Sequence, residues 1–127
     1  MSKKIYVVTG ANQGIGLETS RALAAMGAKV LMVTRTKEKG EAAMADIRRT
    51  HPDADLENYI AELSLLRDMR AAAKEMTERH KVIDGLINNV GTWMSDHVLT
   101  DEGIETVFAT NHLSYFMMTH LLYPSLR

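Results

Sequence analysis

The chain has 127 residues, of which 46% are hydrophobic and 24% charged, and it carries a formal net charge of −1 and no cysteine. These values are typical of one globular domain with a buried core. The balanced charge argues against nucleic acid and anionic membranes as partners, and the absence of cysteine excludes disulfides and thiol chemistry. The five histidines show no metal-ligand spacing, so we expect no metal site. No apolar run approaches the length of a membrane span, and a strand expected from Ile5 leaves no room for a signal peptide, so we expect a cytoplasmic protein.

Apolar runs and helical periodicity alternate along the chain. The runs predict strands at Ile5–Thr9, Lys29–Thr34, Asp55–Leu63 and Val82–Asn88. The periodicity predicts helices over about Gly14–Met26, from a Thr36 cap to His51, from a Ser64 cap to about His80, and from Thr100 to Pro124. Strands that alternate with helices indicate an α/β domain with a parallel sheet, which we expect to occupy residues 1–127.

The periodicity also predicts which helical residues face the core. For the first helix these are Ile15, Thr19, Ala22, Leu23 and Met26. For the second and third they are Gly40, Ala43, Met44, Ile47, and Met69, Ala72, Ala73, Met76, His80. For the last they are Ile104, Val107, Phe108, Asn111, Tyr115, Met118 and Leu122.

A glycine-rich segment, Thr9-Gly10-Ala11-Asn12-Gln13-Gly14-Ile15-Gly16, joins the first predicted strand to the first predicted helix. A helix N-terminus presents free N–H groups and a partial positive charge, and glycines allow the tight turn and the close approach of a pyrophosphate. The segment therefore predicts a dinucleotide-binding site.

The glycine spacing and three further motifs resemble the short-chain dehydrogenase/reductase superfamily. The segment Thr9–Gly16 is similar to the family's T-G-x-x-x-G-x-G signature. Asn88-Asn89-Val90-Gly91 resembles N-N-A-G, Glu62-Leu63-Ser64 resembles D-L-S, and Asp101–Leu113 resembles the segment that leads to the family's helix asparagine. The amino-acid sequence around Arg35 and after Thr100 is most similar to that of the retinol-dehydrogenase-like branch. The resemblance implies a doubly wound, Rossmann-type sheet of strand order 3-2-1-4, incomplete relative to the full family fold.

The resemblance assigns the cofactor-binding residues. The phosphates and the adenosine ribose would be held by Gly10, Asn12, Gln13, Gly14, Ile15 and Gly16. Glu62 and Leu63 would flank the adenine, and Asn89, Val90 and Gly91 would line the ribose and nicotinamide side. The alternative for Asn88 and Asn89 is a polar strand end that closes a turn.

The residues after the second predicted strand bear on the choice of cofactor. An NAD site usually places a carboxylate there for the ribose 2′-hydroxyl, whereas this chain has Thr34, Arg35 and Thr36. A guanidinium can pair bidentately with a 2′-phosphate, and Lys37 and Lys39 add positive charge nearby. We therefore predict NADP(H) as the cofactor, the alternative being that Arg35 only solvates a strand end.

Asn111 is the one catalytic residue that the resemblance assigns to this sequence. It corresponds to the asparagine of the family's Asn-Ser-Tyr-Lys tetrad, which holds a water in the proton relay; the alternative is a structural amide. The family's serine and its Tyr-x-x-x-Lys pair have no counterpart here. Tyr123 is followed by Pro124 and by Arg127 rather than lysine, and a guanidinium can hardly be deprotonated.

The expected function is that of an oxidoreductase that transfers a hydride between NADP(H) and a small alcohol/carbonyl substrate. The chain is expected to be the N-terminal half of a longer enzyme, and to form a homo-oligomer or associate with a C-terminal fragment. The alternative is a non-catalytic nucleotide-binding or protein-interaction module. The sequence does not identify the substrate.

Overall fold

The computed structural model describes residues 3–127 and contains one parallel sheet. Its strands are β1 (Ile5–Thr9), β2 (Lys29–Thr34), β3 (Asp55–Ile60) and β4 (Gly85–Ile87). They pair in the order β3-β2-β1-β4, which confirms the predicted strand order. Strands β3 and β4 are shorter than the predicted strands at Asp55–Leu63 and Val82–Asn88.

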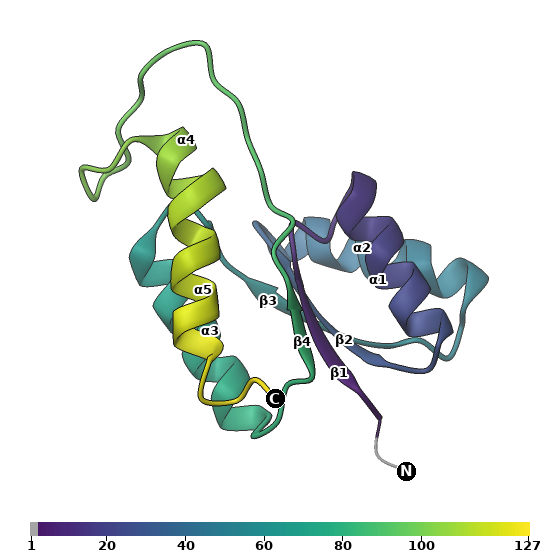
Figure 1. Ribbon diagram of the computed structural model, residues 1–127. Coiled ribbons are helices and arrows are strands. Elements are labelled where there is room, and N and C mark those ends of the chain that lie inside the picture. Colours follow the sequence, from purple (N-terminus) through teal and green to yellow (C-terminus); the bar gives the residue numbers. More distant parts are fainter. Residues whose placement is uncertain (1–2) are drawn as a thin grey trace.

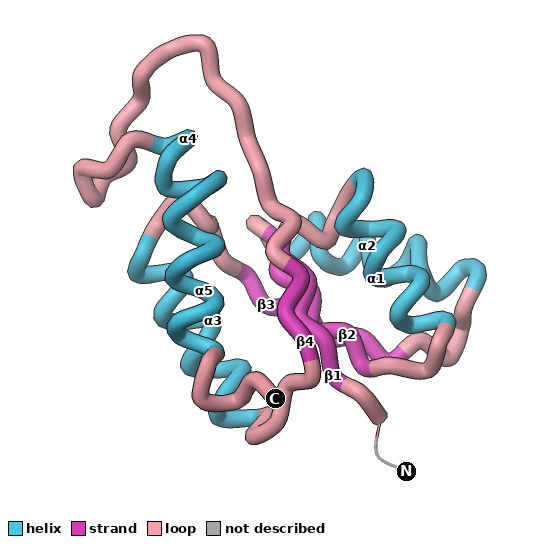
Figure 2. The backbone as a smooth tube through the Cα atoms, viewed as in Figure 1, coloured by secondary structure: helices cyan, strands magenta, loops and turns pink. Residues whose placement is uncertain are grey.

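Helices cover both faces of the sheet (Figure 1). They are α1 (Gly14–Ala25), α2 (Lys37–Thr50), α3 (Leu66–Arg79), α4 (Thr106–Phe108), a π-helical turn (Ala109–Leu113) and α5 (Ser114–Leu122). Helices α1 and α2 lie on one face and α3 and α5 on the other, so the fold is the predicted doubly wound α/β type. Figure 2 shows the longest connection, the loop from Asn88 to Glu105, which leaves the end of β4 and returns to α4.

Two core clusters form because neighbouring residues of a strand point to opposite faces of the sheet. Val7 and Leu31 pack toward α3 and α5, whereas Val8 and Met32 pack toward α1 and α2. All four are fully buried, which explains why these strands have continuous apolar runs rather than an alternating pattern. The predicted inward faces of α2 and α3 are confirmed except at Met44 and His80, which are only partly buried.

The predicted inward face of α1 is confirmed at Leu23, which packs against the core while partly buried, but it is wrong at Ile15, Ala22 and Met26. Ile15 and Met26 are 77% and 75% exposed, and the buried residues are instead Gly16, Ser20 and Ala24. A side chain on Gly16 would collide with the carbonyl oxygen of Gly10, so the helix lies almost against the end of β1. Such an approach requires small residues every four positions, and this pattern is invisible to a search for large apolar side chains.

The helix starts agree with the sequence in only one of the three cases with a predicted cap. The Thr36 hydroxyl accepts a hydrogen bond from Lys39 N, which caps α2 as predicted. Ser64 does not cap α3, because its hydroxyl donates to Glu62 Oε1 instead (2.8 Å). The last helix begins at Thr106 rather than near Thr100, and Glu105 caps it by accepting from Val107 N and Phe108 N.

The predicted inward face of the last helix is also wrong in its first half. Met118 and Leu122 are buried as expected, but Asn111 and Phe108 are exposed. The π-helical turn widens the helix and moves the buried stripe to Thr110 and other small residues. The helix then ends before Pro124 as predicted, and Leu126 forms a parallel bridge with Ile83 beside β4.

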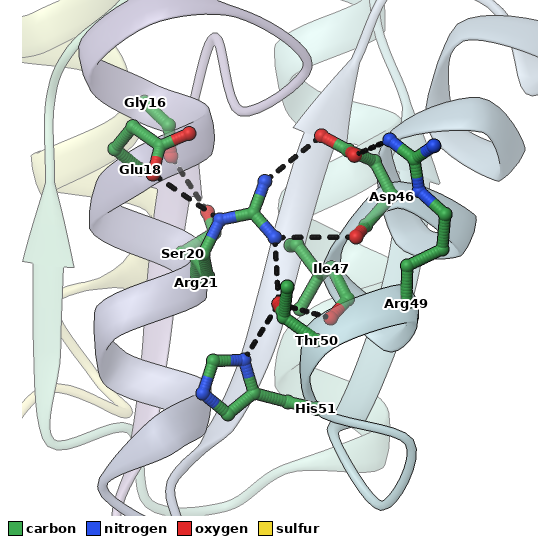
Figure 3. Close-up of polar contacts among 9 residues, drawn as sticks. All are labelled: Gly16, Glu18, Ser20, Arg21, Asp46, Ile47, Arg49, Thr50 and His51. Carbon is green, nitrogen blue, oxygen red and sulfur yellow. Dashed lines mark hydrogen bonds and ion pairs between the residues drawn. The ribbon is translucent and has the colours of Figure 1, made fainter.

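Arg21 joins α1 to α2 through several hydrogen bonds (Figure 3). Its guanidinium donates to the Asp46 carboxylate (2.8 Å), the Asp46 carbonyl (3.2 Å) and the Thr50 hydroxyl (2.9 Å). Glu18 accepts from Arg21 Nε at 3.1 Å, and Arg49 also pairs with Asp46. These contacts lower the pKa of Asp46, chiefly through the hydrogen bonds from Arg49 and Arg21. They fix the relative position of two helices that cover the same face.

A second polar network lies between β2, β3 and the end of α3. Glu57 Oε1 accepts from the Tyr59 hydroxyl (2.5 Å) and contacts His80 Nε2 (2.9 Å), and Lys29 donates to Glu57 Oε2 (3.2 Å). Burial alone would raise the pKa of Glu57, but these hydrogen bonds outweigh it and lower the pKa to about 2. Burial and the Glu57 carboxylate raise the pKa of Tyr59.

The network predicts an acid-sensitive contribution to stability. Because the folded pKa of Glu57 lies below its unfolded value, its contribution is complete above the unfolded pKa and is lost as the pH falls toward about 2. Glu57→Gln should therefore lower the free energy of unfolding by about 1–3 kcal/mol at neutral pH and by much less near pH 3. Urea titrations at both pH values measure this. Glu75→Gln, which breaks an exposed pair with Arg79, should have little effect at either pH; an equal loss in both variants would contradict the assignment.

Candidate functional site

A cleft of about 470 Å³ lies at the carboxyl ends of the four strands. Its lining includes all of the predicted cofactor-binding residues except Gly16 and Thr36: Gly10, Asn12, Gln13, Gly14, Ile15, Thr34, Arg35, Glu62, Leu63, Asn89, Val90 and Gly91. Gly16 lies behind the turn and Thr36 caps α2 beside it. The residues of four separate motifs thus meet at one edge of the sheet, which is where ligands bind in open α/β folds.

Six further lining residues were not among the predicted cofactor-binding residues: Val33, Ala61, Thr92, Met94, Thr106 and Thr110. Val33 and Ala61 adjoin the predicted positions at the ends of two strands. Thr106 and Thr110 come from the start of the last helix, which the sequence placed several residues too early. Trp93 is 80% exposed and does not line the cleft, although it neighbours Met94.

The floor of the cleft is held together by Thr9, the last residue of β1. Its fully buried hydroxyl accepts hydrogen bonds from Asn89 N (2.9 Å) and Val90 N (3.2 Å). The Asn89 side chain donates to the Gly10 carbonyl (3.4 Å). The Thr9 and Asn89 side chains therefore join the end of β1 to the end of β4, a role that Thr9's place before the glycine turn could have suggested.

The first turn of α1 faces the cleft without a side-chain cap. Gln13 is the N-cap residue and makes no capping hydrogen bond through its side chain, within the part of the chain that the structure describes. Gly14 has a φ of 54°, and a side chain built there would meet open space. The N–H groups of this turn and the positive end of the helix are thus available to an anion.

Arg35 and Glu62 are the only ionisable residues that line the cleft, among the residues that the structure describes. Arg35 follows β2 and Glu62 follows β3, and Arg35 Nε lies 2.9 Å from Glu62 Oε2. Thr34, also at the end of β2, is buried, and its hydroxyl bonds to Asn58 Oδ1 (2.7 Å). No carboxylate therefore ends β2, as the sequence indicated.

Asn111 does not line the cleft, and it is exposed rather than on the buried face of the helix. Its amide makes two hydrogen bonds with the backbone of Thr92: Thr92 N donates to Oδ1 (2.8 Å) and Nδ2 donates to the Thr92 carbonyl (2.7 Å). One turn further along, the Tyr115 hydroxyl donates to the Val90 carbonyl (2.7 Å). Both side chains fix the segment that runs from the end of β4 along the cleft.

The loop from Asn88 to Glu105 is attached at its far end to α3. Glu102 accepts hydrogen bonds from Leu66 N (2.6 Å) and Arg67 N (3.1 Å) and so caps α3, a helix that has no capping side chain of its own. The Arg67 guanidinium makes two parallel bonds to Asp101 (3.0 and 2.7 Å), which lower the pKa of Asp101. Asp101 and Glu102, which fall at the start of the helix expected from Thr100, thus stabilise a different helix.

Tyr123 lies outside the cleft. It lines a second hollow with Asn88, Tyr115, Phe116, Thr119 and His120, none of which lines the cleft. The side chain of Asn88 bonds to Thr119 there (3.3 Å), so Asn88 and Asn89 point to different surroundings. Among residues 3–127 no group of three or more acidic or histidine side chains could hold a metal ion, and no helix is long and apolar enough to cross a membrane.

The role of Thr9 can be tested by removing its hydroxyl. Thr9→Val leaves the buried N–H groups of Asn89 and Val90 without their acceptor and should lower the free energy of unfolding by about 1–3 kcal/mol. Thr9→Ser keeps the acceptor and should lose clearly less. Urea denaturation of both variants checks this, and a loss in Thr9→Ser as large as that in Thr9→Val would contradict the particular importance of the hydroxyl.

The role of Glu102 can be tested by hydrogen exchange. Glu102→Ala removes the cap and should increase exchange at the amides of Leu66 and Arg67 and lower stability by about 1 kcal/mol. The loop residues around Thr92 should exchange faster as well, because the far end of the loop is released. Glu78→Gln, a charge change at an exposed position of α3, serves as the control. Unchanged protection at Leu66 and Arg67 in Glu102→Ala would contradict the capping role.

Comparison with known proteins places this architecture in a family. The model of the short chain dehydrogenase family matches residues 4–127. Retinol dehydrogenase 12 of Mus musculus and retinol dehydrogenase 11 of Homo sapiens are each 40% identical over 124 residues, which are 98% of this chain and 39% of either relative. The short-chain dehydrogenase/reductase drtF of Aspergillus calidoustus is 39% identical over 123 residues. The chain thus spans about two fifths of the length of these relatives.

Solved structures of similar proteins support the same family. A metagenomic short-chain oxidoreductase in complex with NADP superposes with a TM-score of 0.83 at 27% identity, over 98% of this chain and 57% of that one. A protein from Mycobacterium paratuberculosis superposes with the same TM-score at 37% identity, over 98% of this chain and 43% of that one. With its cleft, its strand order and its four motifs, the chain belongs to the short-chain dehydrogenase family.

Proposed function

We propose that the cleft binds NADP(H) and that the chain is the dinucleotide-binding part of an oxidoreductase acting on an alcohol/carbonyl pair. The observation that carries the choice of NADP(H) is Arg35, the one cation among the described residues of the lining, at a strand end that has no carboxylate. Two similarities support the proposal: relatives named as retinol dehydrogenases, and a structural neighbour solved with NADP.

The residues fit such a cofactor from one end of the cleft to the other. The open first turn of α1 would hold the pyrophosphate, with Gly14 leaving the space in front of it free. Arg35 would pair with the 2′-phosphate and Leu63 would flank the adenine. Asn89, Val90 and Gly91 would line the nicotinamide side. The remaining predicted contacts, Asn12, Gln13, Ile15, Gly10 and Thr34, complete the lining, with Gly16 and Thr36 shaping it from behind.

The chain's own part in the reaction would be to orient the cofactor. The nicotinamide supplies or accepts the hydride when it is bound. Asn111 would act as a positioning residue, because its amide fixes the backbone of Thr92 at the nicotinamide side. The proton would move through the family's catalytic serine and its Tyr-x-x-x-Lys pair. Neither has a counterpart in these 127 residues, so the chain is expected to bind the cofactor without turnover.

A non-catalytic interaction module remains the second candidate because of the second hollow. Phe116 and Tyr123 are largely exposed at its rim, and such surface is typical of contact sites. A homo-oligomer, or association with a C-terminal fragment, would cover it. Both candidate functions allow NADP(H) binding, and only turnover by the 127-residue chain or by a longer protein containing it separates them.

Binding measurements test the cofactor assignment. The chain should bind NADP⁺ at least about tenfold more tightly than NAD⁺ in calorimetry at matched ionic strength. Arg35→Ala should weaken NADP⁺ binding by about tenfold or more and change NAD⁺ binding by less than about threefold. Arg70→Ala, an exposed position of α3 that does not line the cleft, should change neither. Tighter binding of NAD⁺ than of NADP⁺ would overturn the assignment.

A further inference from the structure

The pairing of Arg35 with Glu62 leaves the cleft without an unpaired cation in its described lining. Among the described lining residues, Glu62 is the one acid that can pair with Arg35, and Arg35 is the one base that can pair with Glu62. A ligand phosphate that approaches Arg35 would therefore meet a guanidinium that already has a carboxylate 2.9 Å from its Nε.

Glu62 is the fixed member of the pair. Its backbone N–H donates to Asp68 Oδ2 (2.8 Å), and its Oε1 accepts from the Ser64 hydroxyl (2.8 Å). Its side chain is 33% exposed, against 62% for Arg35, whose guanidinium pairs with Glu62 alone among residues 3–127. The carboxylate thus stays near the cleft wall, whereas the guanidinium is free to turn.

We propose that Glu62 is a specificity-determining residue of the cleft: by pairing with Arg35 it opposes binding of a 2′-phosphate, and so lowers the preference for NADP(H) over NAD(H). The proposal rests on the proposed function, because it concerns the same cleft and the same ligand. Two effects act together. The phosphate must share or displace the Arg35 contact, and its negative charge comes close to that of Glu62.

The effect is confined to ligands that carry a 2′-phosphate. The ribose 2′-hydroxyl of NAD⁺ is neutral, so it neither competes for Arg35 as an ion nor is repelled by Glu62. Any contact of Glu62 with the adenine is common to both dinucleotides and cancels in the ratio of their dissociation constants. The ratio is therefore the quantity that reports on the pair.

Glu62 could have the opposite role and favour NADP⁺ binding. The direction in which NADP⁺ affinity changes in Glu62→Gln therefore decides between the two roles. A carboxylate at Nε could instead hold Arg35 so that its two terminal nitrogens face the phosphate, as bidentate recognition requires. Removal of the charge would then weaken NADP⁺ binding. Because exposed ion pairs contribute little rigidity, the competition should outweigh any such alignment.

The test compares Glu62→Gln with the wild-type chain by calorimetric titration of NADP⁺ and NAD⁺ at low and at high ionic strength. At low ionic strength Glu62→Gln should raise the preference for NADP⁺ over NAD⁺, measured as the ratio of their dissociation constants, about fivefold. The gain should shrink at high ionic strength because the interaction is screened. Glu75→Gln removes the same charge from an exposed pair with Arg79 outside the cleft lining, and it should leave the ratio unchanged.

A double-mutant cycle shows whether Glu62 acts through Arg35. In an Arg35→Ala background, the gain from Glu62→Gln should fall clearly below the fivefold gain in the wild-type chain, because no guanidinium is left to release and only the repulsion between Glu62 and the phosphate remains. The same loss of effect is not expected in an Arg70→Ala background.

The outcomes separate this proposal from the proposed function. If the wild-type chain is folded by circular dichroism and binds neither dinucleotide, the proposed function fails and the proposal fails with it. If it prefers NADP⁺ but Glu62→Gln leaves the ratio unchanged or lowers it, only the role of Glu62 is overturned. An equal shift in Glu75→Gln would likewise overturn it, because the effect would then follow net charge rather than the pair.

Discussion

The close approach of α1 to the end of β1 is the constraint on which the rest of the structure depends. Gly16 stands where any side chain would strike the Gly10 carbonyl, and a side chain on Gly10 would in turn come within 2.9 Å of Val90 Cα. Three segments, the glycine turn, the first turn of α1 and the end of β4, therefore meet at backbone distance. The cleft exists because these backbones meet without side chains that fill the space, and because the first turn of α1 presents N–H groups to it without a side-chain cap.

The long loop from Asn88 to Glu105 starts where these three segments meet, and polar side chains hold it at both ends. Near β4, Asn111 and Tyr115 bind the backbone of Thr92 and Val90. At the other end Glu102 caps α3, with Arg67 and Asp101 beside it. The loop carries few buried apolar residues, so hydrogen bonds that satisfy backbone groups position it in place of a hydrophobic core. The same polar contacts connect the two helices that cover one face of the sheet to the wall of the cleft.

Charge is distributed unevenly between the two ends of the sheet. Away from the cleft, Glu57 lies among Lys29, Tyr59 and His80 in a network that contributes to stability. In the cleft, Arg35 and Glu62 are more exposed and pair with each other without a third charged side chain of the described lining, so their pairing contributes little to stability. The first network is built to stay in place, whereas the second pair can separate when a ligand competes for one of its members.

The sequence by itself determined the alternation of strands and helices, most of the inward faces of α2 and α3, and the cap of α2. These follow from local patterns: apolar runs, helical periodicity and a hydroxyl before a helix. The resemblance to a family supplied the order of the strands in the sheet and most of the residues expected in the cleft, of which all but Gly16 and Thr36 line it. Only the tertiary structure decided which face of α1 is buried, where the last helix begins, and what Asn111, Glu102 and Glu62 contact. Each of these depends on a partner from a distant part of the chain, as when Glu102 caps a helix 35 and 36 residues away in sequence. A local pattern records the preference of a residue for helix, strand or turn, but the partner of a polar side chain is set by the packing of whole elements, and it is this packing that assembled the site.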